Sequence, residues 1–221
     1  MDWIKTTFFI LIINISFTPT LYGQVSEELL TTNDFWTGFS IKHKLNKKVA
    51  FNLDQQVRIT DDLNEVRSTF FEFGIKYKFN KYFSTRAQYR YTIRNKERHV
   101  NRITVDFNGK WKIKPTKLEL TFRFRLQHAI VTYTKEPATF IRNRIQARYT
   151  FWKKLKLFAA YESFYQFNDK NRFRKNLFAA GLIVPINKKL DLSVFYRLDQ
   201  KINTKNPERT NIVAVLLSLE I

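Results

Sequence analysis

From residue 34 to the end of the chain, segments of strictly alternating apolar and polar side chains follow one another. A period of two is typical of β-strands with one apolar and one polar face. Such a repeat predicts an all-β fold, an antiparallel up-and-down transmembrane β-barrel of 10–12 strands. Eleven segments are read from the sequence, at residues 35–45, 49–60, 66–79, 82–94, 100–113, 118–131, 139–152, 155–167, 172–185, 190–200 and 210–221.

The two faces of these segments differ in chemistry, which raises the question of which face points inward. In segment 118–131, Phe122 and Leu126 alternate with Arg123 and Arg125. A soluble barrel would enclose the apolar face, whereas a membrane barrel would turn it toward lipid. Long segments and a polar face rich in arginine rather than lysine favour the membrane alternative. So do the aromatic residues near the turns, at Phe35, Trp36, Phe79, Tyr82, Phe83, Trp111, Phe151 and Trp152.

The N-terminal residues are typical of an export signal. Lys5 precedes an apolar run at residues 8–13, which Asn14 and Ser16 interrupt, and residues 17–22 then lead to Gly23. We expect residues 1–23 to be a signal peptide cleaved near Gly23, with a short membrane anchor as the alternative. This predicts a location in the bacterial outer membrane. The chain has no cysteine, so disulfides and thiol chemistry are excluded.

The number of strands raises a difficulty. Barrels with both termini in the periplasm need an even number, and eleven segments are read. Either residues 24–33 supply an extra strand or a plug ahead of the barrel domain at 34–221, or one segment is misassigned. Segment 172–185 is the weakest, because its alternation breaks near Phe178. The connections alternate between short and long, which predicts turns in the periplasm and longer loops outside.

Short motifs spread along the chain resemble those of the DUF2490 family, uncharacterised bacterial proteins expected to form outer-membrane barrels. The motifs are Phe35-Trp36-Thr37-Gly38, Gln56-Val57-Arg58, Gly74-Ile75-Lys76-Tyr77, Tyr89-Arg90-Tyr91, Arg123-Phe124-Arg125, Arg142-Asn143-Arg144, Tyr161-Glu162-Ser163-Phe164 and residues 176–181. The resemblance covers essentially the whole chain after residue 23. It implies location and fold, and it offers no activity, cofactor or catalytic residue.

The polar face is the strongest candidate for a functional site, since the chain carries a net charge of +20. An excess of arginine inside a barrel would attract a small anionic solute or a lipid-derived molecule. Alternatively, arginine–carboxylate ladders fill a narrow barrel and have only a structural role. The candidate lumen residues are Arg58, Arg86, Arg90, Arg102, Arg123, Arg125, Arg142, Arg144, Arg148, Glu162 and Arg197.

We expect no enzymatic activity, no cofactor and no metal, since no metal-ligand spacing is present. The alternative is an outer-membrane lipid-modifying enzyme, with His128 or His99, the latter read as a loop residue, as its base. The expected partners are outer-membrane lipids and lipopolysaccharide, the barrel-assembly machinery during insertion, and a small anionic ligand. We expect no nucleic acid, although basic and aromatic residues alternate on several strands.

Overall fold

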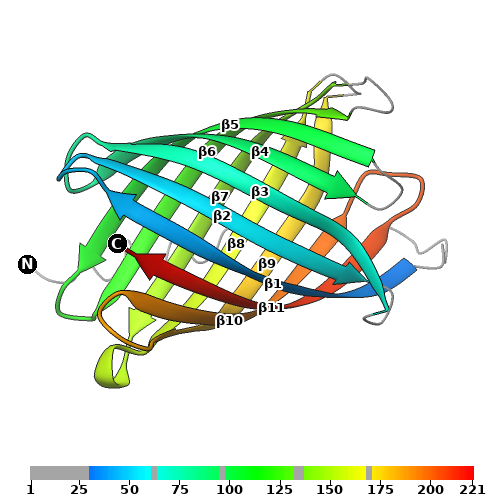
Figure 1. Cartoon of the computed structure of the whole chain (residues 1–221). Coiled ribbons are helices and arrows are strands. Elements are labelled where there is room, and N and C mark those ends of the chain that lie inside the picture. The colour runs from blue at the N-terminus through cyan, green and yellow to red at the C-terminus, as the bar shows by residue number, and fades with distance from the viewer. Residues whose placement is uncertain (1–29, 61–63, 95–97, 132–136, 168–170) are drawn as a thin grey trace, which may run out of the picture.

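The computed structural model describes residues 30–60, 64–94, 98–131, 137–167 and 171–221. These residues form a closed barrel in which each strand pairs with its neighbours along the chain (Figure 1). The elements are β1 (Leu30–Lys44), β2 (Val49–Thr60), β3 (Glu65–Lys78), β4 (Phe83–Arg94), β5 (Arg98–Ile113), β6 (Leu118–Val131), β7 (Pro137–Thr150), the short 3-10 turn η1 (Trp152–Lys154), β8 (Lys156–Gln166), β9 (Arg172–Pro185), β10 (Leu190–Lys201) and β11 (Glu208–Glu220). The all-β barrel with eleven strands is confirmed. The described residues include no helix that could cross a membrane.

The barrel closes through a parallel pair, and this resolves the odd strand number. β1 and β11 run in the same direction, with Leu30 beside Glu208 and Lys42 beside Glu220. All other neighbouring pairs are antiparallel, so the barrel is mixed rather than purely antiparallel. The segment at 172–185, expected to be the weakest, is a full strand, β9. Residues 30–33 belong to β1, whereas residues 1–29, with the expected signal peptide, lie outside the described part.

The two ends of the barrel differ less than the sequence predicts. The end that carries the C-terminus, called the turn end here, has connections of four or five residues at 45–48, 79–82, 114–117, 151–155 and 186–189. The opposite loop end has three to six residues at 61–64, 95–97, 132–136, 167–171 and 202–207. The expected contrast between short and long connections is therefore wrong. Backbone pairing continues into polar strand ends, where apolar alternation has already stopped; β11, for example, begins at Glu208.

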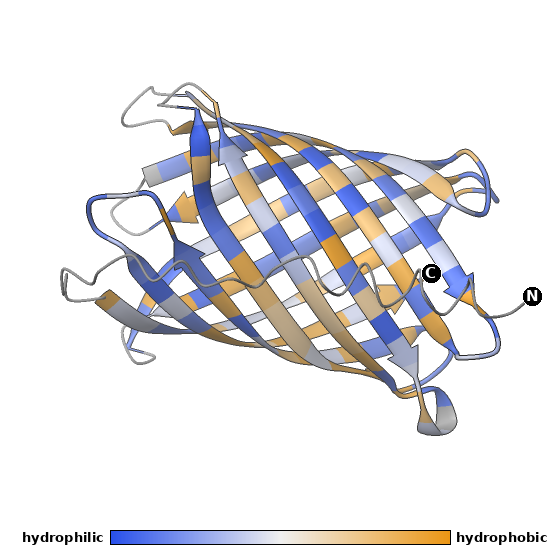
Figure 2. Ribbon diagram, turned by 180° about the vertical axis from the view of Figure 1, so that it is seen from behind, coloured by the Kyte–Doolittle hydropathy of each residue, from blue (hydrophilic) through white to orange (hydrophobic). Residues whose placement is uncertain are grey.

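The outward face is apolar and the inward face is polar. On β6, Leu126 is 43% exposed on the outside, while Arg125 next to it is 4% exposed and points into the lumen. Figure 2 shows the same alternation of hydrophilic and hydrophobic residues along the strands. Large exposed apolar side chains cover the outside of β3, at Phe71, Phe73, Ile75 and Tyr77. Such a continuous apolar surface is rare on soluble monomers and is consistent with a barrel surrounded by lipid.

Candidate functional site

Four cavities follow one another through the barrel. We call them the loop-end chamber (about 170 Å³), the central chamber (about 320 Å³), the turn-end chamber (about 340 Å³) and the lysine basin (about 420 Å³) at the turn-end opening. Adjacent cavities share wall residues. The turn-end chamber shares Arg86, Arg123 and Arg144 with the central chamber, and it shares Lys76, Ser84 and Lys110 with the basin. The cavities therefore form a series along the lumen.

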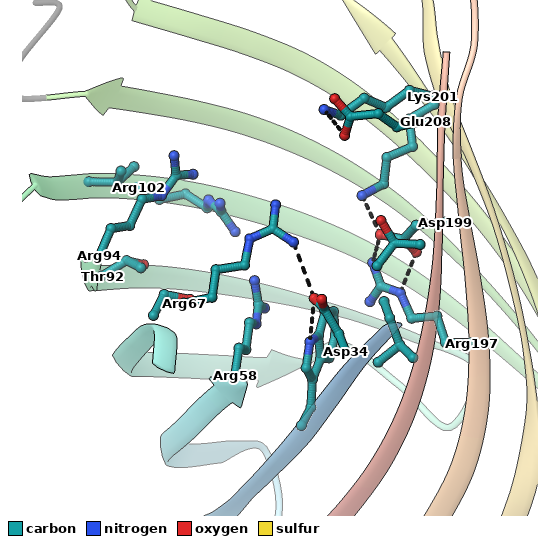
Figure 3. Close-up of a pocket in the computed structure, with 16 residues that line it drawn as sticks. Asp34, Arg58, Arg67, Thr92, Arg94, Arg102, Arg197, Asp199, Lys201 and Glu208 are labelled. Atoms are coloured by element: carbon teal, nitrogen blue, oxygen red, sulfur yellow. Dashed lines mark hydrogen bonds and ion pairs between the residues drawn. The ribbon is translucent and has the colours of Figure 1, made fainter. Parts of the chain in front are cut away.

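A neck joins the loop-end and central chambers. The residues common to both are Trp36, Arg58, Arg102, Lys175 and Arg197. They come from β1, β2, β5, β9 and β10. Strands that are far apart in the sequence contribute because the inward faces of all strands of a closed barrel surround the same lumen. Figure 3 shows the loop-end chamber, with Arg58 and Arg102 on one side and Arg197 on the other. Four of the five neck residues are cationic, so the neck concentrates positive charge.

One group of buried ion pairs is centred on Asp106 of β5. Arg125 donates from Nε to Oδ1 at 2.5 Å and from its terminal nitrogen to Oδ2 at 2.7 Å. Arg86 reaches the same carboxylate at 3.3 Å. Asp106 is 0% exposed, so this carboxylate is taken out of water and needs these partners. A neighbouring pair, Arg90 with Glu72, has a distance of 2.6 Å.

A second group is centred on Glu162 of β8. Arg123 and Arg142, from two different strands, each donate to its Oε1 at 2.8 Å. The side chain of Glu162 is almost fully buried. A third carboxylate, Asp199, accepts from Arg197 at 2.6 and 2.9 Å and from Lys175. Apart from Arg197 with Asp199, which share β10, these pairs link different strands as the ladders of a structural role would.

The carboxylates are too few to pair all the cations. Ten of the residues that line the central chamber are arginine or lysine, and three are aspartate or glutamate. Within the described residues, Arg58, Arg102 and Arg144 form no ion pair with a carboxylate. Arg58 instead lies over the rings of Trp36 and Phe70, at 4.1 and 5.0 Å. The central chamber and its neck thus retain cations that no carboxylate neutralises.

Arginines also face each other directly across the strands. Arg90 is in register with Arg102, and Arg125 with Arg142. Arg123 and Arg144 form a third such pair. Like charges at directly opposed positions repel and destabilise a sheet. Glu162 and Asp106 relieve part of this repulsion, but Arg102 and Arg144 stay without a carboxylate in the described part of the chain.

Several guanidinium groups have a buried donor without an acceptor. The Nε atoms of Arg58, Arg102, Arg123 and Arg144 have no hydrogen-bond partner among the described residues. A buried polar group without a partner costs about 1–3 kcal/mol. These donors lie on the wall of the central chamber. The Nε atoms themselves are enclosed by protein atoms, whereas the arginines that carry them line the chamber with their positive charge.

The structure brings the candidate residues together. The central chamber is lined by Arg58, Arg86, Arg90, Arg102, Arg123, Arg125, Arg142, Arg144, Glu162 and Arg197. Arg148 lies in the adjoining turn-end chamber, where it pairs with Glu119 at 2.8 Å. The alternation of inward and outward residues is what places them on one face.

Two neck residues were missed from the sequence. The sequence groups Trp36 with the aromatic residues near the turns that are typical of a membrane interface, but Trp36 is 6% exposed and lies in the lumen, so that assignment is wrong. The position of Trp36 near the end of the segment led to this assignment. Trp36 is two residues from the buried Asp34, so both side chains point to the same face, and this spacing predicts the lumen correctly.

Lys175 was read as part of an irregular segment. In the pairing of β8 with β9, Phe164 is opposite Lys175 and Tyr165 is opposite Phe173, so Arg174 of β9 is an extra residue. Phe173 therefore points outward and Lys175 inward, although they are two residues apart.

The histidines of the alternative enzyme function do not face the chambers. His99 lies in β5 rather than in a loop, and its Nδ1 is 2.9 Å from the hydroxyl of Tyr91. His128 Nδ1 lies 2.9 Å from Thr139 Oγ1. Ser163 is next to Glu162 in the chain, but the two side chains are on opposite faces of β8, so they do not form a nucleophile–carboxylate pair. Within the described residues, no group of three or more His, Asp or Glu side chains could hold a metal ion.

The comparisons with known proteins agree with this fold. The model of the family described as "Protein of unknown function (DUF2490)" matches residues 33–211. No curated protein matches the chain. A solved bacterial polysaccharide outer membrane secretin is similar in fold, with a TM-score of 0.55 and 10% identity. The match covers 76% of this chain and 63% of that protein, so this chain spans less than two thirds of its length.

Proposed function

The chain belongs to the DUF2490 family of proteins of unknown function, and we propose that it is an outer-membrane barrel whose lumen binds small anions and lets them pass. The observation that carries this proposal is the excess of arginines over carboxylates in the central chamber, where Arg58, Arg102 and Arg144 have no carboxylate partner within the described residues. Small anions such as chloride, phosphate or a carboxylate would neutralise these arginines and accept their hydrogen bonds. The side chains of the neck would determine which of these anions binds or passes most readily.

The outer surface of the barrel supports a location in a membrane. Exposed phenylalanine and other apolar side chains would be costly in water and favourable in a bilayer. The protein of similar fold is named an outer membrane secretin, and this supports the same location. We place the turn end and the C-terminus in the periplasm, as is usual for such barrels. The loop end then faces the cell exterior.

A purely structural lumen is the competing explanation. In that case arginine–carboxylate ladders would neutralise the wall and fill the space. The ladders around Asp106 and Glu162 fit such a role. However, the excess of cations over carboxylates, the directly opposed arginines and the series of cavities are better explained by a lumen that receives anions. A purely structural ladder of ion pairs would require neither an excess of cations nor open cavities.

The experiment is a measurement of ion selectivity in planar bilayers. The purified barrel is placed between potassium chloride solutions of different concentration, and the reversal potential gives the ratio of chloride to potassium permeability. The key variant replaces both Arg58 and Arg102 with glutamine. Neither arginine has a carboxylate partner in the described structure, so this change removes charge without leaving a buried carboxylate unpaired. The matched control is Lys188→Gln, in an exposed turn outside the chambers.

We expect the wild-type barrel to prefer chloride, and the double variant to lose most of that preference. The control should keep it. A folded wild-type barrel that carries no current would overturn the proposal in favour of a structural lumen. A current without preference for anions would overturn it as well. Heat modifiability on SDS gels identifies folded barrels in each sample.

A further inference from the structure

The largest of the four cavities has a different chemistry from the rest. The lysine basin is lined by nine lysines and by no aspartate or glutamate. The lysines are Lys42, Lys44, Lys47, Lys48, Lys76, Lys78, Lys81, Lys110 and Lys112. They come from β1, β3 and β5 and from the turns at 45–48 and 79–82, so the positive charge is gathered on one side of the turn-end opening.

Most of these lysines belong to the inward face of the barrel. Lys76 and Lys78 alternate on β3 with Tyr77, which is exposed on the outside. Lys110 and Lys112 alternate in the same way with the exposed Trp111. Neighbouring residues of a strand point to opposite faces, so these lysines face the lumen while the aromatic residues face outward. The basin therefore opens toward the pore, which argues against the headgroup of a surrounding lipid as its occupant.

The basin is only partly neutralised. Glu220 pairs with Lys42 at 2.5 Å and also with Lys44, and Glu119 pairs with Lys110 at 2.8 Å. Five of the basin lysines have no ion pair within the described part of the chain, namely Lys47, Lys48, Lys76, Lys78 and Lys81. Clustered like charges repel one another, and a partner with several negative charges would relieve this repulsion.

The basin continues into the arginine-lined lumen. It shares Lys76, Ser84 and Lys110 with the turn-end chamber, which in turn shares Arg123 and Arg144 with the central chamber. Lysine is strongly hydrated and flexible, whereas arginine holds carboxylate or phosphate by paired hydrogen bonds. Exposed lysines at the opening suit fast capture, and enclosed arginines suit more specific binding. Both kinds of group lie along the same series of adjacent cavities.

We propose that the lysine basin captures a linear polyanion, a chain of closely spaced phosphate or carboxylate groups, and feeds its end into the lumen. A single small anion would contact only a few of the nine lysines. A chain of anionic groups can contact many at once, because each later contact is intramolecular and gains from a high effective concentration. This inference rests on the proposed anion path and names the substrate class that this path would take.

The test measures block of the chloride current by anions added on the turn side. The probes are orthophosphate, linear polyphosphate and oligogalacturonate, the last two at equal numbers of charges. The basin variant carries Lys76→Gln, Lys78→Gln and Lys112→Gln together. The control variant carries Lys154→Gln, Lys188→Gln and Lys189→Gln, three lysines at the same end that do not line the basin.

We expect polyphosphate or oligogalacturonate to block from the turn side at a concentration at least about tenfold below that of orthophosphate, counted per charge. The basin variant should lose this advantage, and the control variant should keep it. Which polymer blocks more strongly distinguishes phosphate from carboxylate as the preferred group. Equal block by polymer and orthophosphate, or equal loss in both variants, would overturn the proposal.

Binding is also measured without current, so that the two proposals can fail separately. Fluorescently labelled polyphosphate is titrated against detergent-solubilised barrel, and its anisotropy is recorded for the wild type and both variants. Binding that only the basin variant loses would support capture even if the bilayers stayed silent. Silent bilayers would then overturn passage alone. Protein that binds phosphatidylglycerol vesicles through the same lysines, but not the labelled polymer, would show a lipid site instead and overturn the inference.

Discussion

Arg58 and Trp36 are cross-strand neighbours in exact register, and the guanidinium carbon of Arg58 lies 4.1 Å from the centre of the indole ring. Arg197 approaches the same ring at 4.6 Å. An aromatic face attracts a cation through its quadrupole and leaves the guanidinium edge available as a hydrogen-bond donor. Trp36 thereby holds two arginines in the neck without neutralising their charge. Both arginines lie where the loop-end and central chambers meet, so we expect them to act on any anion that moves between these chambers.

Replacement of Trp36 by alanine should widen the neck. We expect a larger single-channel conductance and a weaker preference for anions, since both arginines lose their support. Stability should fall by about 0.5–2 kcal/mol for each cation–π contact that is lost. The midpoint temperature of heat modification on SDS gels measures this change. Trp152→Ala, at a tryptophan that is 70% exposed, is the control and should leave conductance unchanged.

Replacement of Asp106 by asparagine should strongly destabilise the barrel. The change leaves the buried guanidinium of Arg125 without its paired carboxylate, which costs about 3–5 kcal/mol. The midpoint of heat modification should drop markedly. Glu220→Gln removes a carboxylate from two partly exposed lysines and should cost about 0–1 kcal/mol. Similar losses in both variants would show that burial of Asp106 has no special weight.

Replacement of Gly38 by alanine should disturb the barrel wall. A Cβ atom there would lie 2.2 Å from the carbonyl oxygen of Gln55, on the neighbouring strand. Backbone atoms cannot yield cheaply, so we expect a loss of about 1–3 kcal/mol and less folded protein. Gly109→Ala is the control, because its Cβ would meet only the movable ring of Trp111. If Gly109→Ala lowers the stability of the barrel more than Gly38→Ala does, the close approach of the neighbouring backbone at Gly38 does not explain the loss.

An arginine placed on the outer surface tests the membrane setting. Phe73 lies in the middle of β3 and is exposed on the outside. Phe73→Arg should cost about 2–4 kcal/mol in a bilayer, whereas Phe79→Arg, in the turn after β3, should cost about 0–1 kcal/mol. Urea titration of the barrel folded in lipid vesicles gives both values. A soluble barrel would tolerate the two substitutions equally.

Single cysteines can establish which end faces the cell exterior. The chain has no cysteine of its own, so any label reports on the introduced one. We expect Asn203→Cys, in the connection between β10 and β11, to react with a membrane-impermeant maleimide on intact cells. Lys188→Cys, at the turn end, should react only after the outer membrane is opened. The reverse pattern would invert the orientation proposed above.

Sequence alternation was sufficient for the number of strands and for which side chains share a face, whereas the choice of the inward face also needed the arginine and aromatic patterns. It placed Arg125, Arg142 and Glu162 on one face, and the barrel brings that face together inside. The parallel contact of β1 with β11 could not be predicted, because a period of two is the same for parallel and antiparallel neighbours. The role of Trp36 was missed because aromatic residues near strand ends also occur at membrane interfaces.

The ion pairs between residues on non-adjacent strands could not be predicted from the sequence either. Glu162 binds Arg123, which is two strands away, because both side chains are long and cross the curved inner wall. Alternation gives the face of a residue but not its height in the barrel, which depends on the register of every strand pair. The division of the lumen into chambers, and the separation of the lysine basin from the arginine neck, follow from that register.

The most direct test of the account is to locate anions in crystals of the barrel grown in bromide. Anomalous scattering identifies bromide ions and separates them from water. We predict bromide within hydrogen-bond distance of the guanidinium nitrogens of Arg58 or Arg102 in the neck, and fewer bromides there in the Arg58→Gln and Arg102→Gln double variant. A neck in which these atoms bind only water or other side chains, with bromide confined to the exposed lysines, would contradict it.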